Sequence, residues 1–101
     1  MKSTIDKVSE ELHIPSEELI NRGVLAYLEH ELRQTEEDIA DLREKYRVAD
    51  RSDLEGKITR KEIPSHPAWE DLIAWENAEE YIKKLKRAIK RLSESSDLPV
   101  R

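Results

Sequence analysis

Apolar side chains recur at helical spacing in two long stretches of the chain. In the first stretch they alternate at intervals of three and four residues, at Leu25, Leu28, Leu32, Thr35, Ile39, Leu42 and Tyr46. The second stretch repeats this spacing at Trp75, Ala78, Ile82, Leu85, Ile89 and Leu92. Such spacing keeps one face of a supercoiling helix apolar over successive heptads. The pattern therefore predicts two long helices with matching apolar seams.

A short helix is predicted before the first long one. Ser3 or Thr4 serves as its N-cap, and it ends near His13, because Pro15 disfavours helical geometry at the residue before it. Its apolar stripe consists of Ile5, Val8 and Leu12. The long helix that follows is expected to be capped by Ser16 and to run to about residue 46.

The rest of the chain divides into a connector, a long helix and a tail. Residues 47–67 form the connector, in which Ser52 is expected to cap a short helix. Residues 68–93 form the last helix, with Pro67 suited to its first turn, and residues 94–101 are expected to form a flexible tail. The predicted fold is one all-α domain, a helical hairpin or coiled-coil-like bundle in which residues 1–46 supply the N-terminal helix pair.

The two seams pack either against each other within one chain or between two copies of it. A seam that includes the small Ala78 and the polar Thr35 does not specify which arrangement forms. We expect a homodimer, because the seams exceed what a helix pair from a chain of 101 residues easily buries.

Composition narrows the class of protein. Charged residues make up 41% of the chain against 37% hydrophobic, with no Phe and two Gly, which disfavours a turn-rich β-sandwich. No apolar run reaches the ~20 residues that span a bilayer, so we expect a cytoplasmic protein without membrane contact. The absence of Cys excludes disulfides, thiolate zinc sites and thiol catalysis. One Gln and two Asn among so many charged residues are typical of proteins from thermophiles.

The charge is unevenly distributed along the chain. Residues 1–46 carry six Lys or Arg against twelve Asp or Glu, whereas residues 47–101 carry twelve against eleven. A duplex-binding surface is therefore not expected in the first half. The basic run at residues 83–91 follows acidic residues that predict Glu79–Lys83 and Glu80–Lys84 pairs, so it is interpreted as a charged helix face.

No set of residues has the spacing of a catalytic or metal site. His30 stands between Glu29 and Glu31, but successive helical residues point in different directions and cannot converge on one ion. The chain contains neither a glycine-rich phosphate loop nor a nucleophile elbow. We therefore expect no catalytic residues, no metal site, no cofactor and no enzymatic activity.

Arg60 and His66 provide an enzymatic alternative. Their separation resembles the pattern of an Arg, five residues and a His in the helical HEPN ribonucleases, although Lys61 stands where those enzymes usually have Asn, Asp or His. A HEPN-like ribonuclease is kept as an alternative function on this basis.

The start of the last helix carries a second apolar patch. Trp75 belongs to the seam, whereas Trp69, Leu72 and Ile73 project from another side. Either the connector covers this patch with Leu54, Ile58 and Ile63, or a partner protein does, since Trp beside acidic residues is typical of binding hot spots. The residues predicted to bind a partner are Trp69, Glu70, Asp71, Leu72, Ile73 and Glu76.

Two stretches of the sequence resemble antitoxins. IDKVSEELHIPSEELINRGVLAYLEHELR is similar to the two helices of ribbon-helix-helix antitoxins, and HPAWEDLIAWEN after a short helical connector resembles small antitoxin components of prokaryotic toxin–antitoxin pairs. The N-terminal MKST replaces the basic strand with which ribbon-helix-helix proteins enter DNA, so direct DNA binding is not expected. The resemblance implies a protein that binds and neutralises a cognate toxin, such as a ribonuclease. The alternative from another class is a structural coiled-coil or dimerisation module, for which the seams suffice.

Overall fold

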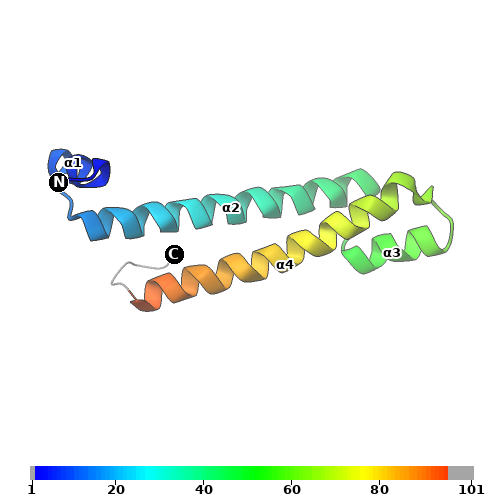
Figure 1. Ribbon diagram of the computed structural model, residues 1–101. Helices are drawn as coiled ribbons and strands as arrows, with labels where there is room; N and C mark the ends of the chain where they lie inside the picture. The colour runs from blue at the N-terminus through cyan, green and yellow to red at the C-terminus, as the bar shows by residue number, and fades with distance from the viewer. Residues whose placement is uncertain (1, 96–101) are drawn as a thin grey trace.

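The structure of the protein is a computed structural model that describes residues 2–95 (Figure 1). Within this range the chain forms four helices and no strand: α1 (Thr4–Leu12), α2 (Ser16–Tyr46), α3 (Arg51–Thr59) and α4 (Ser65–Ser95). Helices α2 and α4 run antiparallel as a hairpin, α3 packs on α4 at its closed end, and α1 packs on the start of α2 at its open end (Figure 1). The predicted all-α fold is confirmed. Of the predicted tail, residues 96–101 lie outside the described residues.

The first two helices begin close to where the sequence predicts. Ser3 is the N-cap of α1, and its hydroxyl accepts a hydrogen bond from the backbone N–H of Asp6, whose carboxylate accepts one from the backbone N–H of Ser3. The N-cap of α2 is Pro15, not Ser16. The Ser16 hydroxyl instead donates to the Asp6 carboxylate at 2.7 Å. This bond ties the start of α2 to α1.

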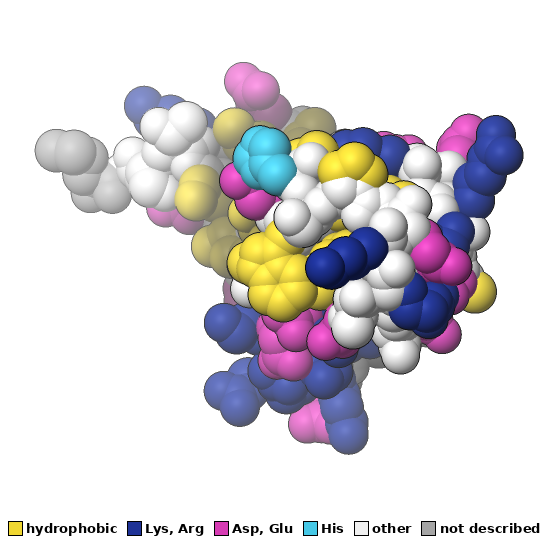
Figure 2. All heavy atoms as spheres, turned by 90° about the vertical axis from the view of Figure 1, so that its right-hand side faces the viewer, with side chains coloured by type: hydrophobic (Ala, Val, Ile, Leu, Met, Phe, Trp, Pro, Cys, Tyr) yellow, Lys and Arg dark blue, Asp and Glu magenta, His cyan; other side chains and the backbone are white. Residues whose placement is uncertain are grey.

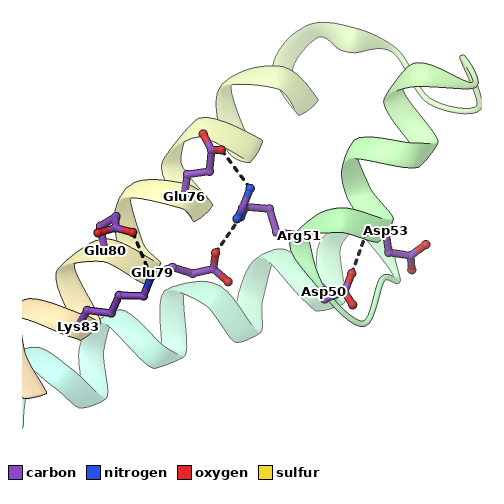
Figure 3. Close-up of polar contacts among 7 residues, drawn as sticks. All are labelled: Asp50, Arg51, Asp53, Glu76, Glu79, Glu80 and Lys83. Carbon is purple, nitrogen blue, oxygen red and sulfur yellow. Dashed lines mark hydrogen bonds and ion pairs between the residues drawn. The ribbon is translucent and has the colours of Figure 1, made fainter.

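The cap of α3 differs from the prediction, whereas the regular part of α4 begins close to it. Asp50, not Ser52, caps α3, because its side chain accepts a hydrogen bond from the backbone N–H of Asp53 at 2.8 Å (Figure 3). Helix α4 includes Ser65, but His66 has non-helical φ and ψ angles of −114° and 127°, so the regular part of α4 begins after it, close to the predicted residue 68. The short helix expected in the connector is therefore present, but it begins at Arg51, directly after the cap residue Asp50.

The most deeply buried part of the core lies at the closed end of the hairpin. Leu54 of α3 and Trp75 of α4 are the largest fully buried side chains, and they share this cluster with Ile39, Val48 and Leu72. Partly buried apolar residues pack around the cluster: Leu42, Tyr46, Ile58, Ile63, Ala78 and Ile82. Three helices thus meet here, and burial of these side chains supplies much of the free energy that closes the hairpin.

The predicted seams pack against each other within one chain. Helix α2 packs along α4, with Ile39 and Leu85 buried at the contact. Thr35 and Trp75 of the seams are also buried, and the remaining seam positions, including Leu25, Leu28, Leu32 and Ile89, are partly buried. The hairpin is therefore formed inside the chain, and a dimer of these seams is not needed to bury them.

Candidate protein-binding surface

Two large apolar side chains remain exposed at the closed end of the hairpin. Trp69 is 50% exposed and Ile73 is 44% exposed, and as residues i and i+4 of α4 they are neighbours on one helix face. Figure 2 looks onto this end of the molecule and shows hydrophobic side chains at the surface close to a histidine. Together with the exposed His66 and Glu70, these residues form what we call the Trp69 surface.

Leu72, predicted as the third apolar residue of this patch, belongs to the core instead. It is 4% exposed and clusters with Leu54 of α3, because the connector folds over this side of α4. Cover by the connector, the first of the two predicted possibilities, therefore applies to Leu72 alone. The connector covers Leu72 and leaves Trp69 and Ile73 open.

Asp71, predicted as part of an acidic rim, is bonded within the chain. Its carboxylate accepts hydrogen bonds from the Lys45 ammonium at 2.8 Å and from the Tyr46 hydroxyl. The Lys45 hydrogen bond, followed by that of Tyr46, lowers the pKa of Asp71. Burial, followed by the hydrogen bond to Asp71, raises the pKa of Tyr46. This network fastens the end of α2 to α4, beside the Trp69 surface.

Glu76, also predicted in the acidic rim, pairs with the connector. Arg51 of α3 lies between two carboxylates of α4, at 3.0 Å from Glu76 and 2.7 Å from Glu79 (Figure 3). The hydrogen bond to Glu79 raises the pKa of Arg51, so this guanidinium stays charged. Of the three predicted acids, only Glu70 has an exposed carboxylate without a Lys or Arg partner among residues 2–95, and His66 Nδ1 lies 3.4 Å from it.

The ion pairs along α4 also differ from those predicted. Lys83 pairs with Glu80 at 3.2 Å, three residues away, while Glu79 turns to Arg51 (Figure 3). The helical spacing allows Lys83 to pair with either Glu79 or Glu80. Glu79 pairs with Arg51 of α3 instead, which leaves Glu80 for Lys83. Lys84 has no ion pair in the part of the chain that the structure describes.

The residues of the ribonuclease alternative are bound to different carboxylates. Arg60 pairs with Glu62 at 3.0 Å, and His66 lies next to Glu70. Within residues 2–95, no group of three or more His, Asp or Glu side chains is arranged to hold a metal ion. In the same range, no helix is long and apolar enough to cross a membrane.

The comparisons with known proteins give one match. Residues 1–97 match the model of the uncharacterized protein MJ0235 family. No curated protein and no solved structure matches the chain. The family match covers the complete hairpin, including the Trp69 surface and the connector that supports it.

Proposed function

We propose that the chain, which belongs to the uncharacterized protein MJ0235 family, binds and inhibits a partner protein through the Trp69 surface. The observation that carries this proposal is the exposure of Trp69 and Ile73 side by side on α4. Trp is among the residue types most enriched in binding hot spots, because one side chain removes a large apolar area from water.

The Trp69 surface is supported by a well-anchored helix. Directly beneath it, Ala68, Leu72 and Trp75 are buried, so the backbone of α4 cannot shift without disrupting the core. The bonds of Asp71 to Lys45 and Tyr46 hold the same turn from the side. A partner therefore meets a pre-organised surface and little conformational entropy is lost there on binding.

The charge of α2 supports a basic partner. Five exposed carboxylates on the half of α2 that leads to the closed end make no ion pair in the described part of the chain: Glu36, Glu37, Asp38, Asp41 and Glu44. With a net charge of −5, the chain would be steered electrostatically towards a positively charged surface. A toxin that cleaves RNA needs such a surface for its substrate, and covering it requires no catalytic group. The resemblance to antitoxins supports a toxin as the partner.

Co-expression with the protein encoded by the adjacent gene tests this proposal. We expect the wild-type chain to co-purify with that protein and to restore growth when the protein is toxic. Trp69→Ala should lose both effects, whereas Trp69→Phe, which keeps an aromatic ring, should retain most of them. A wild-type chain that neither co-purifies nor restores growth contradicts the proposal. RNA cleavage by the purified chain that His66→Ala abolishes would replace it with the ribonuclease alternative.

A further inference from the structure

Helix α1 presents its apolar side to solvent. Ile5, Val8 and Leu12, its complete apolar stripe, are each between 39% and 54% exposed, whereas its buried residue is Ser9. An amphipathic surface helix normally buries the apolar stripe and exposes the polar residues. In the single chain α1 leaves much of this stripe in water, although Ile5 and Val8 also line a hollow with Leu19 and Ile20 of α2.

The exposed apolar surface continues from α1 onto the start of α2. Ile20 and Val24 are 45% and 44% exposed there. Between the two helices lies a hollow of about 190 Å³ whose walls are almost entirely apolar, lined by Thr4, Ile5, Val8, Leu19 and Ile20. We call Ile5, Val8, Leu12, Ile20 and Val24 the open-end surface. It lies at the end of the hairpin that carries α1, opposite the end where α4 begins (Figure 1).

The chain exposes more surface than a compact monomer of its size. Its accessible surface is 7716 Å², whereas a compact monomer of 11.9 kDa exposes about 6,000 Å². The molecule measures 62 × 24 × 19 Å along its principal axes, and this elongated shape is the reason for the excess. A stable interface of standard size removes about 800 Å² from each partner. An interface of that size would remove about half of the excess from each chain.

We propose that a second copy of this chain covers the open-end surface, with the two α1 helices antiparallel around a two-fold axis. The apolar stripe of each α1 then lies against the hollow of the other protomer. In such an isologous interface the same residues supply both the stripe and the hollow, so the surface is complementary to itself. This interface is separate from the Trp69 surface and does not depend on the proposed partner.

The charges beside the stripe fit an antiparallel second copy. Lys7 and Glu11 are exposed on one flank of the α1 stripe, four residues apart, and neither makes an ion pair in the described part of the chain. A two-fold axis near the middle of α1 places Lys7 opposite the partner's Glu11, and Glu11 opposite the partner's Lys7. The antiparallel dimer therefore has two Lys7–Glu11 ion pairs between its subunits. A parallel arrangement would instead place Lys7 beside Lys7 and Glu11 beside Glu11.

Sedimentation equilibrium of the purified full chain tests the dimer. We expect twice the chain mass for the wild type and the mass of a single chain for Val8→Glu and Leu12→Glu. The helical circular dichroism of both variants should be unchanged, because both side chains are already exposed. Ile73→Glu, which puts the same charge on an equally exposed position at the closed end, should remain a dimer.

The charge swap tests the antiparallel arrangement. Lys7→Glu should weaken the dimer by about tenfold or more through repulsion from Glu11 of the partner subunit, and the double variant Lys7→Glu/Glu11→Lys should restore it. A wild-type chain that stays a monomer at high micromolar concentration overturns the proposal. So does a dimer that persists in both Val8→Glu and Leu12→Glu, or a swap variant that fails to recover. None of these outcomes affects binding at the Trp69 surface.

Discussion

Trp69 and Trp75 lie six residues apart on α4, and the first is 50% exposed while the second is 1% exposed. The two side chains point to different sides of the helix. Trp75 faces α2 and α3 and joins the core, whereas Trp69 lies outside the cover that the connector provides. One tryptophan therefore stabilises the fold and the other is available for a partner.

Substitution by alanine should separate the roles of the two tryptophans. We expect Trp75→Ala to lower the free energy of unfolding by about 3 to 5 kcal/mol, the usual cost of emptying a large core site. Trp69→Ala should lower it by less than about 1 kcal/mol, because half of that side chain is already in water. Urea unfolding followed by circular dichroism measures both values. Equal losses for the two variants would contradict the assigned roles.

The environment of each tryptophan is also visible in fluorescence. Trp69→Phe leaves only the buried Trp75, so its emission should lie at shorter wavelength than that of the wild type and should resist quenching by iodide. Trp75→Phe leaves only the exposed Trp69, so its emission should lie at longer wavelength and should be quenched readily by iodide. Trp75→Phe should also destabilise the fold less than Trp75→Ala, because the buried Nε1 of Trp75 has no hydrogen-bond partner among the described residues. Emission from Trp75 that iodide quenches readily would show that the core is open.

The bonds of Asp71 should make the stability depend on pH in the acidic range. Because Lys45 and Tyr46 lower the pKa of Asp71 in the folded state, its contribution is present above the ordinary carboxyl pKa and is lost as the pH falls through the folded value. Asp71→Asn should cost about 1 kcal/mol at neutral pH, and the difference from the wild type should narrow below about pH 4. Unfolding midpoints measured between neutral and acidic pH test this, and a difference that stays constant would contradict it.

The apolar contact between α2 and α4 should not tolerate charge. Leu85→Asp places a carboxylate at a position that is 4% exposed and should cost several kcal/mol. Lys84→Asp, at the adjacent exposed position, makes a charge change on the same helix and serves as the control. Thermal unfolding should show a large fall in melting temperature for Leu85→Asp alone. A comparable fall for Lys84→Asp would mean that α4 is rotated from the described orientation.

The packing of α3 on α4 should depend more on the buried Leu54 than on the ion pairs of Arg51. Leu54 is fully buried, so Leu54→Ala should cost about 2 to 5 kcal/mol and should speed hydrogen exchange in α3. Arg51→Ala removes two partly exposed ion pairs and should cost less than about 1 kcal/mol, with a loss that shrinks at high salt. A larger effect from Arg51→Ala than from Leu54→Ala would contradict the burial seen at this end.

The two long helices were predictable because their information is local, whereas the choice between a hairpin and a dimer of the seams was left open. The spacing of apolar residues is a property of each helix alone, and the bounds of α2 at Ser16 and Tyr46 agree with it. The cap of α3 was missed because Asp50 and Ser52 are both good capping residues within two positions of each other. Sequence signals of this kind do not resolve a helix start to the residue.

The surface residues were only partly predictable because they depend on contacts between distant elements. Leu72 and Trp69 have the same apolar character in the sequence, and only the position of α3 shows that one is covered. Likewise, Asp71 is bonded by Lys45, which lies 26 residues away. The stripe of α1 was recognised as apolar, but no local signal shows that the chain leaves it half exposed.

The affinity of the Trp69→Ala variant for the protein encoded by the adjacent gene shows whether the Trp69 surface binds the partner. Titration calorimetry should show that the wild type binds, that Trp69→Ala binds about 30-fold more weakly, and that Trp69→Phe loses much less. Leu12→Glu is the matched control at the open end and should bind as the wild type does. Unchanged affinity of Trp69→Ala, with the wild type bound, would contradict the claim that this surface holds the partner.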